Sequence, residues 1–359
     1  MVTLPNIDIV FAQKASTLVQ RSARGIVALI IKDDTDKTFN TKEYTSLSDL
    51  EKDVTLYTSA NYQYIVDTLT FAINKVIVVR VDTTETVADA LAILEKVTNT
   101  GWITTVGTDE DYTTLGNWVK AKEALNKSYK AVVYNVTSPD SKYVVNFVNA
   151  NVIFNDARLN QTGENYLPSL AGIFASCNIE KGSTYFHCTN LKGVEEVADV
   201  EATLNEGKLV LINDTGKVRI ALGINSLVTF GDGTTEDMRF IDFCEAMSLI
   251  VDDIVATFKN DFLAKGVKNT LDNQMAFISA VNIYFANLAK EEILDVNYTN
   301  IAEINVEAQR AAWTTSNPEV ATWDDAKVKN MPYKRNVFLA GNIKINGAME
   351  NLQFNITIA

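Results

Sequence analysis

The sequence predicts an α/β (α+β) protein with mixed sheets, flanking helices, several subdomains and extended β-strand arms at both ends. Two observations carry this prediction. Over the first two thirds of the chain, continuous apolar runs alternate with amphipathic stretches of about ten to fifteen residues, which is typical of a largely parallel sheet covered by helices. Both chain ends instead carry short segments in which apolar and polar residues alternate, the pattern of half-buried strands.

The first half of the chain reads as a regular series of strands and helices. An apolar run of strand length predicts a strand buried on both faces, and a Ser, Thr or Asp ahead of a helical pattern predicts its first turn. Ser46 or Ser48 is the expected cap of the first helix. Strands are expected at 25–34, 75–82, 101–107 and 129–136, with helices at 46–55, 61–74, 85–99 and 112–126.

The second half is less regular. Residues 142–154 fit a helix or a strand equally well. Helices are expected at 166–177 and 194–207, and strands at 208–214 and 217–230.

After residue 230 the pattern becomes helical. Apolar residues at steps of three and four from Phe240 to Phe262 predict a long amphipathic helix that Gly266 can end. Thr270 can cap the next helix. The acidic residues Asp242, Glu245, Asp252 and Asp253 on the long helix favour a solvated or partner-facing side over a catalytic carboxylate pair.

The two end segments are candidate partner-binding strands. The last one follows a strand expected at 337–345 and an Asn346-Gly347 turn. From the residues alone, this last strand could equally be an edge of its own sheet or join another molecule. Its apolar face and that of the first segment consist of Ile7, Ile9 and Phe11, and of Leu352, Phe354, Ile356 and Ile358.

Composition narrows the possible functions. The chain carries 45 acidic and 32 basic residues, a formal net charge of −13, which disfavours nucleic acid and anionic membrane as partners. No run of apolar residues is long enough for a transmembrane span, and we expect no signal peptide at the N-terminus. A single histidine, His187, argues against multi-histidine metal sites, and three cysteines without metal-binding spacing indicate reduced, buried thiols.

The best candidate for chemistry is the segment "SLVTFGDGTTEDMRF" at 226–240. A strand followed by Gly231-x-Gly233 and a helix is the setting of a dinucleotide fingerprint, so a cytosolic α/β enzyme that binds a nucleotide here is the alternative function. Glu236 occupies the third glycine position and would repel a pyrophosphate. A two-glycine turn that leads to a threonine cap is the simpler interpretation. A third class, a surface-layer or adhesin-type lattice protein, should carry a signal peptide.

Four stretches together point to a known family. They are residues 167–185, the strand pair at 208–230, the long helix at 238–254 with the segment 262–288 that follows it, and the terminal 336–358. In their order and spacing they resemble the tail sheath proteins of contractile phage tails and phage-tail-like R-type bacteriocins, in particular the short type of this family. Residues 21–33 and 71–82 are also similar to the short sheath type.

The resemblance implies a structural protein without catalytic residues, metal or cofactor. It implies hexameric rings stacked in a helical sheath, in which arm strands join sheets of neighbouring subunits and contraction drives a tail tube through a cell envelope. The implied partners are further copies of the chain, the tail tube protein, and baseplate and tail-terminator proteins. Such a subunit is made in the bacterial cytoplasm and assembled into a virion or bacteriocin tail.

The expected domains follow from the pattern and the resemblance together. They are an N-terminal arm and linker at 1–20, a small α/β domain at 21–95, a central α/β domain at 96–230, a conserved C-terminal sheath domain at 231–348 and an arm strand at 349–359.

Overall fold

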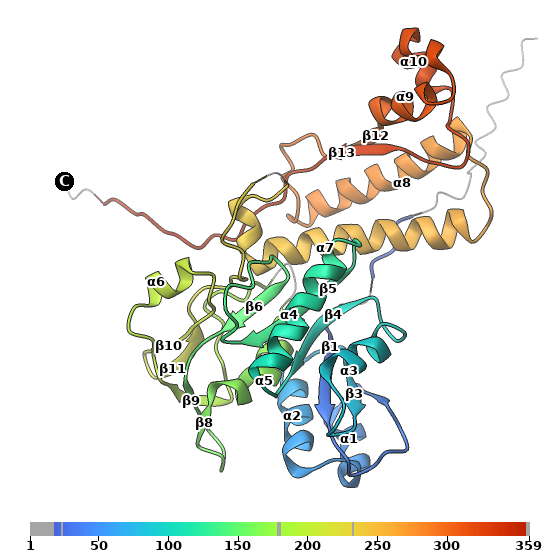
Figure 1. Ribbon diagram of the computed structural model, residues 1–359. Coiled ribbons are helices and arrows are strands. Elements are labelled where there is room, and N and C mark those ends of the chain that lie inside the picture. Colours follow the sequence, from blue (N-terminus) through green and yellow to red (C-terminus); the bar gives the residue numbers. More distant parts are fainter. Residues whose placement is uncertain (1–17, 23, 178–180, 232, 357–359) are drawn as a thin grey trace, which may run out of the picture. The chain divides into compact units, whose positions relative to one another are not determined.

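The computed structural model describes residues 18–22, 24–177, 181–231 and 233–356 (Figure 1). The chain forms two compact units. The large unit comprises Ser22–Asp252 and Gly347–Ala359, and the small unit comprises Met1–Arg21 and Asp253–Asn346. The mixture of sheets and helices confirms the predicted α/β class.

A six-stranded sheet with the strand order β2-β3-β1-β4-β5-β6 forms the centre of the large unit. All neighbours in it are parallel except the edge strand β2, which runs antiparallel to β3. The continuous apolar runs in the sequence become its buried inner strands. The strands are β1 (Ile26–Lys32), β2 (Thr41–Tyr44), β3 (Lys75–Val81), β4 (Thr100–Thr105), β5 (Ser128–Tyr134) and β6 (Val144–Phe147).

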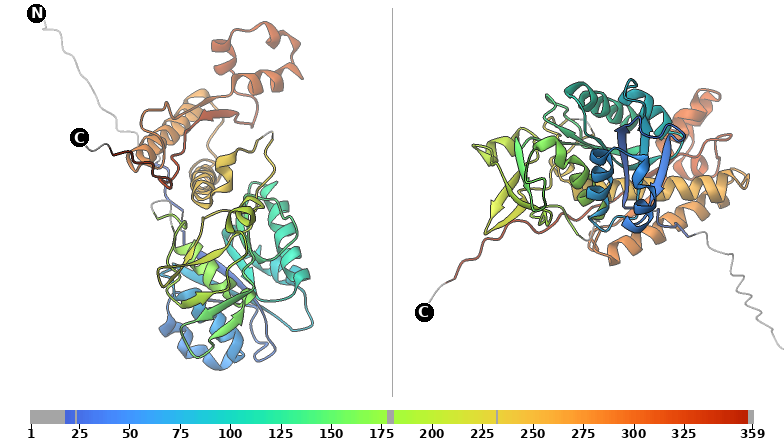
Figure 2. Two further views of the ribbon diagram at one scale, coloured as in Figure 1. Left: turned by 90° about the vertical axis from the view of Figure 1, so that its left-hand side faces the viewer. Right: turned by 90° about the horizontal axis from the view of Figure 1, so that it is seen from below.

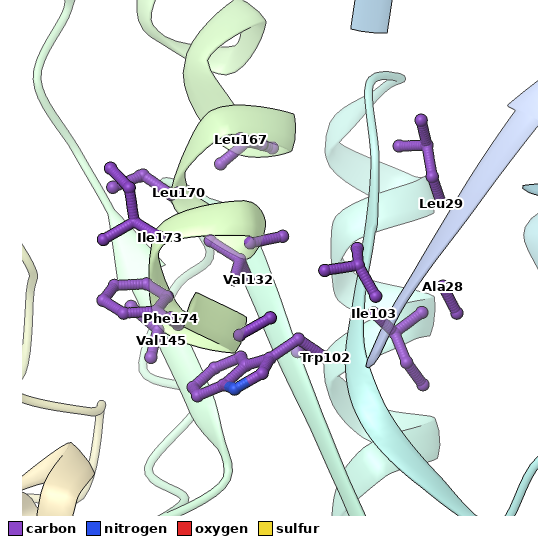
Figure 3. Packing of buried hydrophobic residues seen from close by; sticks show 14 of the residues in the cluster. Ala28, Leu29, Trp102, Ile103, Val132, Val145, Leu167, Leu170, Ile173 and Phe174 are labelled. Atoms are coloured by element: carbon purple, nitrogen blue, oxygen red, sulfur yellow. The ribbon is translucent and has the colours of Figure 1, made fainter. Parts of the chain in front are cut away.

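Helices cover both faces of this sheet (Figure 2). Helices α2 (Ser59–Leu69) and α5 (Leu167–Ser176) pack together on one face, and α3 (Val87–Leu94) packs beside α4 (Asp109–Glu123). Figure 3 shows how α5 places Ile173 and Phe174 against strand residues such as Trp102, whose ring centroid lies 5.0 Å from that of Phe174. The parallel sheet is therefore buried, as its apolar strands require.

Short polar side chains begin the helices. Ser46, the predicted cap, accepts a hydrogen bond from the backbone N–H of Asp49 and starts the short helix α1 (Leu47–Leu50), which continues as η1 (Glu51–Leu56). Thr86 and Thr108 each form a capping box with an aspartate three residues later. These caps satisfy backbone donors that the first helical turn leaves unpaired.

Residues 142–230 differ most from the sequence prediction. The ambiguous stretch 142–154 holds two strands, β6 and β7 (Asn151–Phe154), and β7 pairs with β8 (Asn160–Thr162) and β9 (Leu191–Val194). The helix expected at 194–207 begins later, as α6 (Val200–Asn205), because Val194 pairs with Val152 in the sheet and Asp199 caps the helix.

The strand predicted at 217–230 is also shorter. A two-stranded sheet joins β10 (Leu211–Asp214) to β11 (Lys217–Ile220). Beyond it the backbone of Gly223 runs so close to the segment at 183–184 that an added Cβ would lie 2.3 Å from Ser183 Oγ. Because of this close approach, the strand ends before Gly223.

The expected division at residues 95 and 96 falls inside the six-stranded sheet. Strand β4, which follows this point, pairs with β1 and thereby joins the expected 21–95 and 96–230 segments in one layer. Backbone pairing between β1 and β4 is therefore the physical reason that these segments share a core.

The small unit is mainly helical. Helix α7 (Ile241–Thr257) begins in the large unit and continues into the small one, where it leads into a π-helical turn, η4 (Phe258–Leu263). Gly266 then adopts a left-handed φ of 63°, and Thr270 caps α8 (Leu271–Lys290) as predicted. The remaining elements are η2 (Gly163–Tyr166) and η3 (Glu236–Arg239) in the large unit, and β12 (Ile301–Ile304), α9 (Val306–Thr314), η5 (Pro318–Thr322), α10 (Asp325–Lys329) and β13 (Leu339–Asn342) in the small unit.

The acidic side of α7 is bound within the protein, contrary to the solvated or partner-facing side that the sequence suggested. Glu245 lies 2.9 Å from Lys130 Nζ on β5, and their side chains are 12% and 3% exposed. Asp252 accepts a hydrogen bond of 2.7 Å from Ser128 Oγ. Asp253 is buried and accepts one of 2.6 Å from Tyr284 Oη. The helix uses these carboxylates to meet polar groups that would otherwise be buried alone.

None of the helices in the described part of the chain combines the length and apolarity needed to span a bilayer.

We expect Glu245→Gln to lower the free energy of unfolding by about 3 kcal/mol, because it leaves the Lys130 ammonium buried without a counter-charge. Urea denaturation followed by circular dichroism measures this change. The matched control is Glu201→Gln on the exposed side of α6, with an expected change below about 0.5 kcal/mol. Equal changes in both variants would contradict the role assigned to the Lys130 pair.

Candidate assembly site

The Gly231/Gly233 turn lacks the geometry of a dinucleotide site. A Cβ added at either glycine would meet nothing within 4 Å. The two glycines therefore do not face the wall of a ligand pocket. The element that follows is the four-residue 3-10 helix η3, with Glu236 and Asp237 in its first turn. A phosphate site of this kind needs the N-terminus of a full helix and no negative charge beside it.

The other usual ligand position in such a sheet is also occupied by the protein's own side chains. Strands β1 and β4 are neighbours where the chain order reverses, and ligands of doubly wound sheets bind at the carboxyl ends of such strands. Here Lys32 Nζ lies 2.9 Å from Asp111 Oδ1, and Asp111 itself closes the capping box of α4. Asp109 and Glu110 add further negative charge to that helix N-terminus, which disfavours an anionic ligand.

The root of the C-terminal arm is fixed to the start of α7. The backbone N–H groups of Ala348 and Phe243 donate to the Asp242 carboxylate, the latter at 2.8 Å. Burial raises the pKa of Asp242, and these hydrogen bonds oppose the rise. A cavity of about 690 Å³ lies beside this attachment, between residues 182–185, 221–223 and 348–351.

Beyond its root the arm is exposed. Met349 is 100% exposed, Leu352 90%, Phe354 73% and Ile356 72%. Residues 347–356 form no strand, although their alternation predicts one from 352 onward. A strand is stable only when its backbone groups meet a neighbouring strand, and no described segment of this chain takes that position.

The other predicted arm residues lie outside the described part of the chain. These residues are Ile7, Ile9, Phe11 and Ile358. The linker that precedes the body is described from residue 18, and its Arg21 forms an ion pair with Glu291, directly after α8.

The small unit contains a sheet of only two described strands, β12 and β13, paired antiparallel. The outer edge of β12 is covered by α8, because the Asn282 side chain accepts from the Ala302 N–H at 2.7 Å and donates to the Ala302 carbonyl at 3.1 Å. An amide side chain thus takes the place of a neighbouring strand at this point.

Within the described part of the chain, no segment pairs with the outer edge of β13. The Asn305 N–H donates to the Phe338 carbonyl at 2.9 Å, which sets the phase of the ladder. Bonded and non-bonded pairs alternate in an antiparallel sheet, so the N–H and C=O groups of Leu339 and Gly341 point away from β12. No described backbone group meets them. This edge can accept one more strand.

The sequence predicts residues 352–358 as an arm strand, but it gives no indication of the Asp242 contact at the root of this segment, of the Asn282 contact with β12, or of the unpaired edge of β13. The alternation of the arm is a local signal. The other three features depend on contacts between segments far apart in the chain, so the sequence around a single Asp or Asn does not predict them.

Residues 233–359 match the family described as the phage tail sheath C-terminal domain. The tail sheath protein of Clostridium phage phiCD119 is 30% identical over 368 residues, which cover 99% of this chain and 99% of the relative.

Two solved structures share the fold. The sheath tail protein of Desulfitobacterium hafniense has a TM-score of 0.69 at 14% identity and covers 84% of this chain and 94% of its own. The PVC sheath complex of an extracellular contractile injection system, in its contracted state, has a TM-score of 0.70 at 10% identity and covers 99% of this chain and 98% of its own. The relationship to the phage protein runs through nearly the full length of both sequences, and this chain therefore belongs to the family of phage tail sheath proteins.

Proposed function

We propose that this chain is the structural subunit of a contractile tail sheath, which polymerises helically around a tail tube through exchanged β-strand arms and contracts to drive the tube through a cell envelope. The observation that carries the proposal is the combination, in one chain, of an exposed apolar arm and a strand edge that no described segment covers. Each subunit can then donate an arm and accept one.

The energetics favour a polymer over a single exchange. Four apolar side chains of the arm contribute about 1.5–3 kcal/mol each when buried. Ordering eight backbone residues costs about 1–2 kcal/mol each, which is of similar size. One docked arm is therefore marginal. In a lattice, every further contact of a subunit raises the effective concentration of its arms, so the docked arms reinforce one another.

Contraction requires contacts that persist while subunits move. Strand pairing can persist because the arms connect to the body through short linkers, with anchors at Asp242 and at Glu291. Segments 13–24 and 346–351 are the proposed hinges. Hexameric rings stacked in a helix, a tail tube, a baseplate and a tail terminator are the assembly in which such a subunit would act, after synthesis in the bacterial cytoplasm.

Electron microscopy of the purified chain at rising concentration tests the function. We expect hollow tubes with helical ridges. A protein that stays monomeric at every concentration, with and without a tail tube as template, would contradict the proposal.

Removal of residues 349–359 should leave a folded subunit that cannot polymerise. The side chains of residues 349, 352, 354 and 356 are 72–100% exposed, so the body loses little packing. Thermal melting should change little, while sedimentation shows monomer at concentrations where the full chain forms tubes. An unfolded body after truncation would show that the arm belongs to the core of its own molecule.

Ile356→Asp should prevent polymerisation, because it places a charge on the arm face that becomes buried on pairing. The matched control is Asn355→Asp, which adds the same charge to the opposite face of the strand. Tube formation by light scattering should fail for the first variant and proceed for the second. If the two behave alike, the arm does not dock as a strand with one buried face.

A further inference from the structure

The small unit contains a groove with an aromatic floor. It has a volume of about 510 Å³ and lies between the π-helical turn, the start of α8 and the segment at 334–337. Three phenylalanines form the floor. The ring centroid of Phe277 lies 4.9 Å from that of Phe262 and 5.4 Å from that of Phe258. Leu263 and Val267 line the groove as well and are 66% and 40% exposed.

The groove also has polar and cationic side chains in its lining. Gln274 is only 3% exposed, and its Nε2 donates to Asn269, but its Oε1 is buried without a hydrogen-bond donor. Lys268 and Arg335 line the groove and form no ion pair within the described part of the chain. None of the described lining residues is acidic. Two cationic side chains without a described counter-charge, in a lining with no acidic residue, make this groove complementary to a negatively charged partner.

The large unit projects a turn with the complementary chemistry. Phe230 is 43% exposed and Val228 37% exposed, and both lie in the exposed loop that contains Gly231 and Gly233. Glu236 and Asp237 follow in exposed positions. The loop is held at its base, because Asp140 accepts hydrogen bonds from the backbone N–H groups of Val228 and Thr229 at 2.8 and 3.1 Å. It is closed at its tip by a hydrogen bond of 3.0 Å from Thr234 to Gly231.

We propose that the Phe230 turn of one subunit docks in the Phe277 groove of a second copy of this chain. Phe230 occupies the aromatic floor, and Glu236 and Asp237 face Lys268 and Arg335. An aromatic anchor inside a charged rim is the usual centre of a protein interface. This contact rests on the proposed polymerisation and adds a second, side-chain-specific joint to the strand exchange.

The symmetry of this contact suits a sheath. The turn and the groove are different surfaces, so the contact is heterologous and repeats from subunit to subunit. Such a contact closes into a ring or continues as a helix, and it never stops at a dimer as a two-fold contact does. The two glycines, which the sequence offered as a nucleotide turn, then serve to project an aromatic residue.

A charge exchange tests the contact in the full chain. The groove variant is Lys268→Glu with Arg335→Glu, and the turn variant is Glu236→Lys with Asp237→Lys. Each alone should raise the concentration needed for tube formation about tenfold or more, because like charges then meet across the joint. The two together should restore it to within about twofold. Failure of the combined variant, with a normal melting temperature, would overturn the proposal.

A matched control separates this effect from net charge. Lys96→Glu with Lys192→Glu changes the charge by the same amount at two exposed positions away from the groove. It should polymerise as the wild type does. A groove variant that polymerises normally but no longer binds a tail tube would assign the groove to the tube and overturn the contact between copies.

Cross-linking tests the contact without reliance on tubes. Val228→Cys with Val267→Cys, which keeps Phe230, should give disulfide-linked dimers and longer ladders whose yield rises with protein concentration, whereas Val228→Cys with Met275→Cys, on an exposed side of α8, should not. A cross-link within one chain, or none, overturns the proposal. Ladders without tubes contradict the sheath function alone, and tubes without ladders contradict this contact alone.

Discussion

The attachment of α7 to the central sheet is the interaction on which the rest of the structure depends. Lys130 and Glu245 are both nearly buried, and each is tolerated only because the other is there. Asp252 adds a second polar contact to β5 through Ser128. The chain passes from the large unit to the small unit within this helix, and the C-terminal arm starts from Asp242 at its first turn. One helix therefore carries the chain into the second unit and also anchors the root of the arm.

The sequence predicted the local elements of the fold well because their signals are local. Apolar runs such as 25–34 and 75–82 became parallel inner strands, and Ser46 and Thr270 cap helices as expected. Predictions stayed open or failed where pairing partners decide the outcome. Residues 142–154, for which the pattern fitted a helix or a strand equally well, hold two strands, and Val194 lies in a strand instead of the expected helix because it pairs with Val152.

The candidate site was predicted in the same uneven way. Alternation predicts Leu352, Phe354 and Ile356 as one face of an arm strand, and the structure leaves all three exposed. The β13 edge proposed as the acceptor could not be predicted, since the direction of its free backbone groups follows from the ladder phase set at Asn305. The acidic side of α7 was misjudged because a carboxylate that pairs with a buried lysine has the same sequence pattern as one in water.

The unpaired edge that β13 presents in the described structure bears on how far the sequences of such proteins can diverge. It offers only main-chain N–H and C=O groups, and these are identical in every amino acid. Under the proposed exchange, the sequences of an arm and its acceptor strand can therefore change independently while the two strands still pair. The arm must only keep its alternation of apolar and polar residues. Side-chain contacts between subunits lack this tolerance, because a substitution on one side requires a compensating substitution on the other.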